Sequence, residues 1–125
     1  MNDLVPILRS FDERLASRFY IDYLGGEELF RHRFDETAPL YLGLTLCGFE
    51  IHLSEHHGDA TPGSAIRLKV TNLDTLYRTL QQKSYRNARP SIIDQPWARD
   101  LPILDPFGNR IIFSEPLVPE YTASR

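Results

Sequence analysis

The chain has 125 residues, of which 42% are hydrophobic and 25% charged, with a formal net charge of −3. This composition is typical of one globular domain. No basic stripe is interleaved with aromatic residues, so no nucleic-acid partner is expected, because phosphate binding needs a concentrated positive patch. No apolar run approaches the roughly 20 residues that span a bilayer, and no signal-peptide pattern is present, so no membrane contact is expected. Cys47 is the only cysteine, which excludes an internal disulfide and favours a cytoplasmic location.

The first half of the chain predicts one strand, one helix and three further strands. Residues 5–9 form a short apolar run, after which Ser10 and Glu13 have the spacing of a capping box at a helix start. Apolar residues at three- and four-residue intervals over 15–24 indicate an amphipathic helix of about three turns, and Gly25-Gly26 ends it. Strands with polar and apolar residues in alternation are then expected over 27–34, 38–47 and 49–54.

The second half repeats this order of elements about 60 residues later, which indicates an internal duplication. The polar segment 55–63 links the two halves, and Asn72 is the expected cap of a second helix. Asp105 to Asn109 has the composition of a tight turn, and residues 116–125 are expected to form a loosely held tail. The strands of this half are expected over 65–70, 88–93, 99–104 and 110–114.

The sequence therefore predicts an α+β fold with two tandem βαβββ modules. The modules span about residues 4–54 and 64–115 and belong to a single domain over residues 1–115. Neither module can cover both faces of its own curved sheet, so the two are expected to pack together.

Three features of the sequence resemble the vicinal oxygen chelate superfamily, which includes glyoxalases, extradiol dioxygenases and bleomycin resistance proteins. They are the paired modules, the helix end Phe19-Tyr20-x-x-Tyr23-Leu24-Gly25 and the turn Asp105-Pro106-Phe107-Gly108-Asn109. Gln95-Pro96-Trp97 is most similar to the bleomycin resistance proteins, although this chain has Ala98 where they usually have glycine. The resemblance implies two cupped mixed sheets and a homodimer that exchanges its N-terminal strand or a module, with Pro6 at the crossing point.

The resemblance also identifies where a metal would bind. Metalloenzymes of the superfamily use four strand positions, which in this chain are about Val5, His52, Ala65 and Ile112. A divalent ion needs oxygen or nitrogen donors, and three of these four side chains have none. We therefore expect no metal, no other cofactor and no enzymatic activity. The alternative is a lyase or dioxygenase with an unrecognised metal site at His52 and Glu50.

Other polar residues are open to two interpretations. His52 is predicted to face the cup, where it either binds a ligand or is satisfied by Glu50, Arg67 or water. Residues 56–59, His-His-Gly-Asp, are interpreted as a solvated loop rather than a metal site. Cys47 has no catalytic partner in its strand and is interpreted as a buried structural thiol.

Trp97 is the only tryptophan and lies among polar residues, where it is either a core residue or a stacking surface for a planar ligand. We favour the ligand role. Phe30 and Phe34 lie where the resistance proteins carry aromatic residues that face a bound heterocycle, with sheet packing as the alternative. The predicted ligand-binding residues are Trp97, Phe30, Phe34, His52, Glu50 and Arg67.

These expectations define one leading function. The chain is predicted to bind and sequester a bleomycin-type glycopeptide antibiotic in a cleft between the subunits of a homodimer, without metal and without turnover. A metalloenzyme and a binder of another planar small molecule are the alternatives, because a fold does not specify a function.

Overall fold

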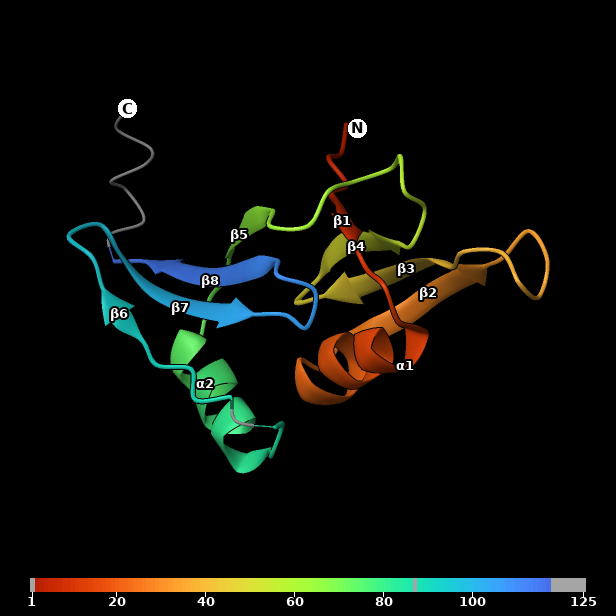
Figure 1. The fold of residues 1–125 in the computed structure, drawn as a ribbon. Helices are drawn as coiled ribbons and strands as arrows, with labels where there is room; N and C mark the ends of the chain where they lie inside the picture. The colour runs from red at the N-terminus through yellow and green to blue at the C-terminus, as the bar shows by residue number, and fades with distance from the viewer. Residues whose placement is uncertain (1, 87, 118–125) are drawn as a thin grey trace. The chain divides into compact units, whose positions relative to one another are not determined.

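The computed structural model describes residues 2–86 and 88–117 and divides the chain into two compact units. The first unit extends to Ser64 and includes Asp105–Asn109, whereas the second consists of Ala65–Leu104 and the segment from Arg110 onward. Each unit contains one βαβββ module with a four-stranded mixed sheet (Figure 1), which confirms the predicted α+β class and the internal duplication. No helix in the described ranges is long and apolar enough to cross a membrane.

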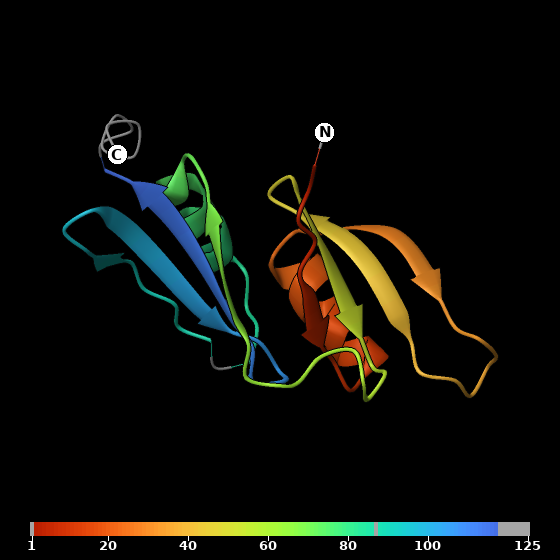
Figure 2. The same ribbon diagram turned by 90° about the horizontal axis from the view of Figure 1, so that it is seen from above.

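The first module has a sheet with the strand order β1-β4-β3-β2, in which β1 is parallel to β4 and the other pairs are antiparallel. Its helix lies along one face of this sheet (Figure 2). The elements are β1 (Ile7–Arg9), α1 (Glu13–Ala16), the π-helix η1 (Ser17–Tyr23), β2 (Glu27–His32), β3 (Tyr41–Leu46) and β4 (Phe49–Ser54).

The alternation in β4 shows how the sequence positions its two faces. Ile51 and Leu53 are buried in the core, while Glu50 is exposed and His52 is half-buried on the opposite face. In β2 the helix side is identified by Arg31, which reaches Glu13 of the helix, so its neighbour Phe30 lies on the opposite side with His52. The sheet therefore buries one face against the helix and leaves polar and aromatic side chains on the other.

Asp12, rather than Ser10, caps the first helix. The Asp12 carboxylate accepts a hydrogen bond from the backbone N–H of Leu15 at 2.9 Å. Ser10 is still engaged in strand pairing, because its N–H donates to the Ser54 carbonyl at 2.9 Å. The predicted capping box is thus wrong by two residues, since β1 continues its pairing past the end predicted from the apolar run.

The helix itself is confirmed, but its second part is wider than an α-helix. The π-helical turns end where the N–H of Leu24 donates to the Phe19 carbonyl and that of Gly26 to the Tyr20 carbonyl, both at 2.9 Å. Gly25 has φ +81°, the left-handed conformation expected at a helix end. Periodicity alone does not distinguish α- from π-helical turns over so short a segment.

The second module repeats the topology with the strand order β5-β8-β7-β6. Its strand predicted over residues 88–93 is wrong, because of these residues only Ile93 pairs, at the start of a two-residue strand. Pro90 lacks an N–H to donate and interrupts the segment. Pro116 belongs to the last strand rather than to the tail, and residues 118–125 of the predicted tail lie outside the described residues. The elements are β5 (Ala65–Lys69), α2 (Leu73–Gln82), β6 (Ile93–Asp94), β7 (Ala98–Leu104) and β8 (Arg110–Pro116).

The start of α2 is capped from a distant strand. Asn72 is the N-cap residue, as predicted, but it has φ +59° and its side chain makes no capping hydrogen bond. The Glu115 carboxylate of β8 instead accepts from the N–H groups of Asn72 and Leu73, at 3.2 and 3.3 Å. A tertiary contact therefore replaces the local cap.

Asp105 is a buried hydrogen-bond centre in the first unit. It joins the two sequence motifs, because it begins the 105–109 turn and bonds Tyr20 of the helix end. Its carboxylate accepts from the backbone N–H groups of Phe107 and Asn109, at 2.8 and 2.7 Å, which closes the turn. It also accepts from the Asn109 side chain at 2.9 Å and the Tyr20 hydroxyl at 2.6 Å. Burial, and secondarily the Asp105 charge, raise the pKa of Tyr20 well above its ordinary value, so this hydroxyl remains a donor.

Candidate functional site

Three rings form a cluster on the face of the first sheet opposite the helix, and we call Phe30, Tyr41 and His52 the aromatic platform. They come from β2, β3 and β4, which are neighbours in the sheet. The Phe30 and Tyr41 rings are nearly parallel, at 7° with centroids 6.1 Å apart. Both are edge-on to the His52 ring, each at 5.2 Å. Phe30 is 40% exposed, so the platform presents ring surface to a ligand.

Gly43 makes this arrangement possible. It pairs with Phe30 on one side and with His52 on the other, so it occupies the centre of the row. A Cβ atom at this position would lie 2.6 Å from Cζ of Phe30 and closer still to Cε2, so the ring rests directly over the glycine backbone. A glycine inside a strand commonly marks such a close approach. That signal was present in the sequence, but the prediction used neither Gly43 nor Tyr41.

A chain of hydrogen bonds fixes the orientation of His52. The Tyr41 hydroxyl lies 2.7 Å from Nδ1 of His52, and the Glu50 carboxylate lies 2.7 Å from Nε2. The carboxylate can only accept, so we assign the ring proton to Nε2 and the role of acceptor from Tyr41 to Nδ1. Of the partners that the sequence offered for His52, Glu50 is the one in contact, with Tyr41 as a second partner that the sequence did not reveal.

This assignment determines what the platform offers to a ligand. The Tyr41 proton is committed to His52, so the phenolic oxygen can accept a further hydrogen bond, as can the Glu50 carboxylate. Burial, with smaller effects from Asp59 and Glu50, raises the pKa of Tyr41, so this hydroxyl stays protonated at neutral pH. Aromatic faces also attract cations. The platform is therefore suited to planar groups that carry hydrogen-bond donors or positive charge.

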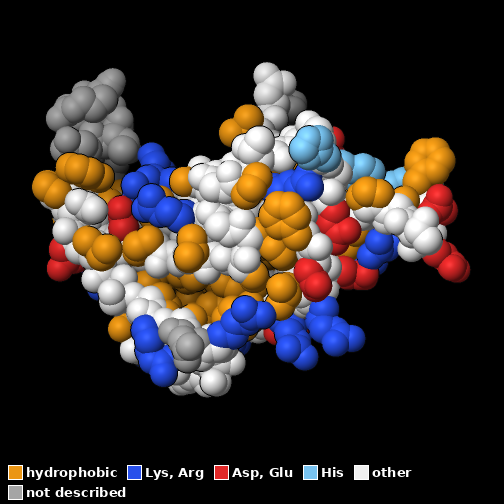
Figure 3. Space-filling view, viewed as in Figure 1, with side chains coloured by type: hydrophobic (Ala, Val, Ile, Leu, Met, Phe, Trp, Pro, Cys, Tyr) orange, Lys and Arg blue, Asp and Glu red, His pale blue; other side chains and the backbone are white. Residues whose placement is uncertain are grey.

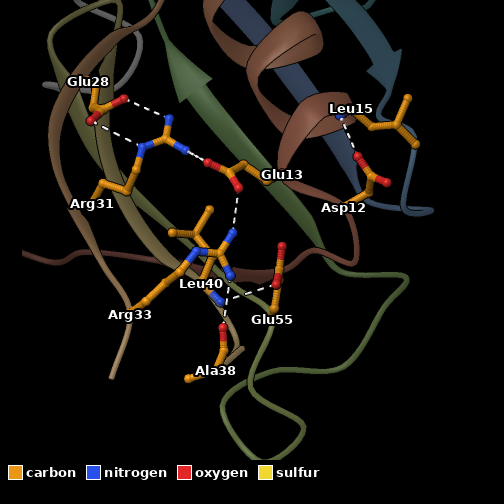
Figure 4. Close-up of polar contacts among 9 residues, drawn as sticks. All are labelled: Asp12, Glu13, Leu15, Glu28, Arg31, Arg33, Ala38, Leu40 and Glu55. Carbon is orange, nitrogen blue, oxygen red and sulfur yellow. Dashed lines mark hydrogen bonds and ion pairs between the residues drawn. The ribbon is translucent and has the colours of Figure 1, made fainter. Parts of the chain in front are cut away.

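The edge strand that carries Phe30 is held to the helix by an ion-pair network (Figure 4). Glu13 of α1 receives hydrogen bonds from both Arg31 and Arg33. Arg31 also bonds Glu28 at 2.8 Å, and Arg33 donates to the Ala38 carbonyl at 2.8 Å. In the space-filling view, acidic and basic side chains lie side by side over the α1 and β2 region (Figure 3). The network restrains β2 and so helps to keep Phe30 over the sheet.

Phe34 and Trp97 are exposed aromatic residues outside the platform. Phe34 follows the end of β2 and is 86% exposed. Trp97 is 52% exposed in the turn before β7, where the N–H of Gln95 donates to the Ala98 carbonyl at 2.8 Å. Trp97 is therefore not a core residue, which excludes the first of the two interpretations, core packing or ligand stacking, that the sequence left open.

Arg67 belongs to the second unit and has partners other than His52. Its Nη1 donates to Asp100 at 2.8 Å and to the Ser114 hydroxyl at 3.2 Å. The Asp100 side chain is 6% exposed and that of Arg67 is 44% exposed. Arg67 therefore satisfies a buried carboxylate and keeps part of its guanidinium in contact with solvent.

The metal positions expected in the superfamily do not contain a suitable set of donors. The residue opposite His52 is Ile7, not Val5, and the residue opposite Ile112 is Arg67, not Ala65. Neither replacement is a metal ligand. Both ring nitrogens of His52 are already hydrogen-bonded. Within residues 2–86 and 88–117, no group of three or more His, Cys, Asp or Glu side chains could hold a metal ion.

Two further predictions concern turns. Cys47 is exposed, so its interpretation as a buried thiol is wrong. It forms the β3–β4 turn together with Gly48, at φ +52° and +84°, and such a two-residue turn projects its side chains away from the core. In the 56–59 loop, Asp59 accepts from the Ser54 hydroxyl at 2.6 Å and thereby ties the loop to the end of β4.

The fold and the open aromatic face define a protein built from paired βαβββ modules, and the sequence comparison identifies the family. A sequence model described as "Glyoxalase superfamily protein" matches residues 1–119. The chain therefore belongs to the glyoxalase superfamily, as the motifs predicted. No curated protein matches the chain significantly.

Solved structures share this fold at low sequence identity. The glyoxylase/bleomycin resistance protein/dioxygenase domain from Frankia sp. EAN1pec has a TM-score of 0.72 at 22% identity, over 100% of this chain and 98% of that one. TnmS3, an antibiotic binding protein from Streptomyces sp. CB03234, has 0.67 at 19%, over 90% and 93%. A bleomycin-binding protein complexed with bleomycin has 0.65 at 20%, over 92% and 98%. At these identities the similarity establishes the fold alone.

Proposed function

We propose that this protein binds a planar, antibiotic-type small molecule on the aromatic platform and sequesters it without chemical turnover. The observation that carries the proposal is that Phe30, Tyr41 and His52 already contact one another on an open sheet face. A ligand can stack there without rearrangement of the protein, and preorganisation favours affinity. Because two structurally similar proteins are described as binding an antibiotic or bleomycin, a bleomycin-type glycopeptide is the first ligand to test.

The chemistry of the platform narrows the ligand class. Stacking of a planar group on an aromatic side chain contributes about 1–3 kcal/mol per contact in comparable sites. The Tyr41 oxygen and the Glu50 carboxylate add acceptors for an amine or amide of the ligand. In the proposal, Phe34 of the same unit supplies further stacking surface, as an exposed side chain is able to do. Trp97 and Arg67 belong to the second unit and are proposed as ligand contacts on the sequence resemblance and their own exposure alone.

The proposal includes a homodimer that holds the drug away from DNA in the cytoplasm. It is supported by the resemblance to resistance proteins, whose antibiotic-binding members are dimers. Light scattering coupled to size-exclusion chromatography, with and without the drug, measures the assembly state directly. A particle with the mass of one chain under both conditions contradicts the dimer.

Titration with bleomycin, monitored through Trp97 fluorescence, tests binding in the wild-type protein. We expect a saturable change at micromolar drug concentrations, and its absence contradicts the proposal. Phe30→Leu should raise the Kd about tenfold, since it removes one stacking contact but keeps an apolar side chain. Phe34→Leu is the matched control for a ring outside the platform, and an equal loss in both variants contradicts the central role of the platform.

A metalloenzyme is the second candidate function, and the 2.7 Å contact between His52 and Glu50 is the observation that favours it. Elemental analysis after dialysis distinguishes the two functions. A stoichiometric divalent metal that is lost in His52→Gln supports the enzyme, whereas a metal-free protein that still binds the drug supports sequestration.

A further inference from the structure

Arg9 combines burial with missing hydrogen-bond partners. It is the last residue of β1, and its Nε and Nη1 atoms are buried with no partner among the residues that the structure describes. A guanidinium group keeps its charge in a protein and carries five N–H donors. Buried donors without acceptors destabilise a folded chain, so such a group requires an explanation. One explanation is that a ligand supplies the missing acceptor, and the position of the side chain supports it.

The register of the sheet shows which face carries the Arg9 side chain. Leu8 pairs with Leu53, and both are buried in the core. Arg9 pairs with Ser54 in the next register position and so lies on the opposite face, which is the face of the aromatic platform. From strand rise and spacing, its backbone is roughly 8 Å from that of His52. A ligand on the platform can therefore extend to Arg9.

Two contacts hold Arg9 in place. Its guanidinium carbon lies 4.8 Å from the centroid of the Phe11 ring, and the Phe11 ring packs against Phe107 at 6.1 Å. The Arg9 carbonyl accepts a hydrogen bond from the Asn109 side chain at 2.9 Å. Stacking on a ring occupies the flat face of a guanidinium and leaves the donors at its edge free for carboxylate or phosphate oxygens.

Asp59, in the 56–59 loop, is bonded to the register partner of Arg9, and the structure shows no bond from Asp59 to Arg9 itself. Asp59 accepts from the hydroxyl of Ser54, the residue that pairs with Arg9. The same Ser54 hydroxyl oxygen accepts from the backbone N–H of His56 at 3.1 Å. Among the described residues, no carboxylate forms an ion pair with Arg9.

We propose that Arg9 is an oxyanion-binding residue whose guanidinium binds a carboxylate or phosphate group of a ligand on this face. This site adds a charge preference opposite to that of the platform, which favours donors and cations. A molecule with a planar body and an acidic group fits both. The oxyanion site does not depend on the platform ligand, so a simple anion binds here even if no antibiotic binds.

The wild-type protein is titrated with inorganic phosphate, with benzoate and with benzamidine at constant ionic strength. The Nε–Hε resonance of Arg9, followed by NMR, is expected to shift saturably with the anions and not with benzamidine. The melting temperature should rise by about 3–6 °C at an anion concentration ten times its Kd. Tighter binding of phosphate than of benzoate indicates a phosphorylated ligand, and the reverse order indicates a carboxylate on a planar body.

Arg9→Met is the test variant, and Arg14→Met, which removes an exposed arginine from α1, is its control for the loss of one charge. Arg9→Met should raise the anion Kd at least about tenfold, as expected for loss of a charged hydrogen bond, while Arg14→Met changes it less than about twofold. Without anion, Arg9→Met should be at least as stable as the wild type, because it replaces unpaired buried donors with an apolar side chain of similar length.

Three results overturn the proposal. One is the absence of a saturable Arg9 resonance shift in the wild type, which does not depend on any variant. Another is an equal loss of anion binding in Arg14→Met, which assigns the effect to net charge. The third is a large destabilisation of Arg9→Met without anion, which shows that protein groups such as Asp59 pair with the guanidinium in solution. Failure of bleomycin binding, in contrast, leaves the phosphate titration unaffected and contradicts only the proposed function.

Discussion

The two modules have the same strand order but differ in what they place on the sheet face opposite the helix. In each module an arginine that bonds the helix shows which side of its strand faces the helix: Arg31 reaches Glu13 of α1, and Arg99 reaches Asp74 of α2. The preceding residue of β2 is Phe30, which belongs to an aromatic and acceptor-rich surface. The residue after Arg99 is Asp100, which is buried under the Arg67 guanidinium.

This difference shows that two modules with the same fold can carry side chains with different chemical properties. The repeated topology determines which positions face away from the helix, because alternation and strand order are the same in both modules. The residues at those positions determine whether the face attracts planar donors or satisfies a buried charge. Function therefore resides in the side chains placed on the fold and not in the fold itself.

The largest expected effect concerns the buried carboxylate of each unit. Asp105→Ala leaves four donors without their acceptor, among them the Tyr20 hydroxyl, and should lower the free energy of unfolding by about 3–5 kcal/mol. Asp100→Ala should cost about 1–2 kcal/mol, because Arg67 keeps Ser114 and reaches solvent. Urea denaturation measures both. Equal losses contradict the view that only the first carboxylate is a multi-donor centre.

Gly43→Ala should have an intermediate effect on stability and a large effect on the platform. The added methyl group overlaps the Phe30 ring, which must leave its position over β3. We expect a loss of about 1–3 kcal/mol, as for other overpacked sites, together with weaker ligand stacking. The crystal structure of the variant and a drug titration provide the check. An unmoved Phe30 ring contradicts the close approach described above.

A smaller effect is expected where each sheet is tied to its helix. Glu13→Ala removes the acceptor of two arginines and should cost about 1 kcal/mol, the upper end for exposed ion pairs. Asp74→Ala removes a single, more exposed partner of Arg99 and should cost less. Thermal unfolding at low and high salt compares the two, and only the Glu13 variant should lose most of its salt sensitivity. A larger loss of stability in Asp74→Ala than in Glu13→Ala contradicts a network at β2.

The tyrosines of the first unit should lower the free energy of unfolding at alkaline pH and leave it unchanged at neutral pH. Burial raises the pKa of Tyr20, Tyr23 and Tyr41 above the ordinary value of 10.0. A pKa that is raised in the folded state contributes stability that is complete below the ordinary, unfolded-state pKa of 10.0 and is lost as the pH rises from there through the folded-state pKa. Hydrogen exchange above pH 10 should show the first unit opening before the second. Tyr20→Phe removes the largest part of this dependence.

Sequence patterns predicted the elements that depend on local periodicity. Alternation over 49–54 predicted a two-faced strand, and in β4 His52 does lie on the face opposite the buried Ile51 and Leu53. The start of the first helix and the 88–93 strand were wrong. In the first case long-range pairing of Ser10 with Ser54 extended the strand, and in the second Pro90 interrupted the pairing. Local signals do not include the partner strand, which decides such boundaries.

The candidate site was predicted only in part for the same reason. Phe30, His52 and Glu50 were recognised, and the structure brings them together. Tyr41 and Gly43 were missed, because their roles depend on the register between β2, β3 and β4. A shift of one residue moves every side chain to the other face, so register cannot be inferred from one strand alone.

The sequence by itself determined the duplicated α+β architecture, the family and the open face of β4. These follow from periodicity and from turn residues whose conformational preferences are local. Only the tertiary structure decided that Phe30 lies over Gly43, that Glu115 caps the second helix, and that two buried donors of Arg9 have no partner among the residues described. These features join residues far apart in the chain, and their energies depend on which groups the fold brings within hydrogen-bond or van der Waals distance.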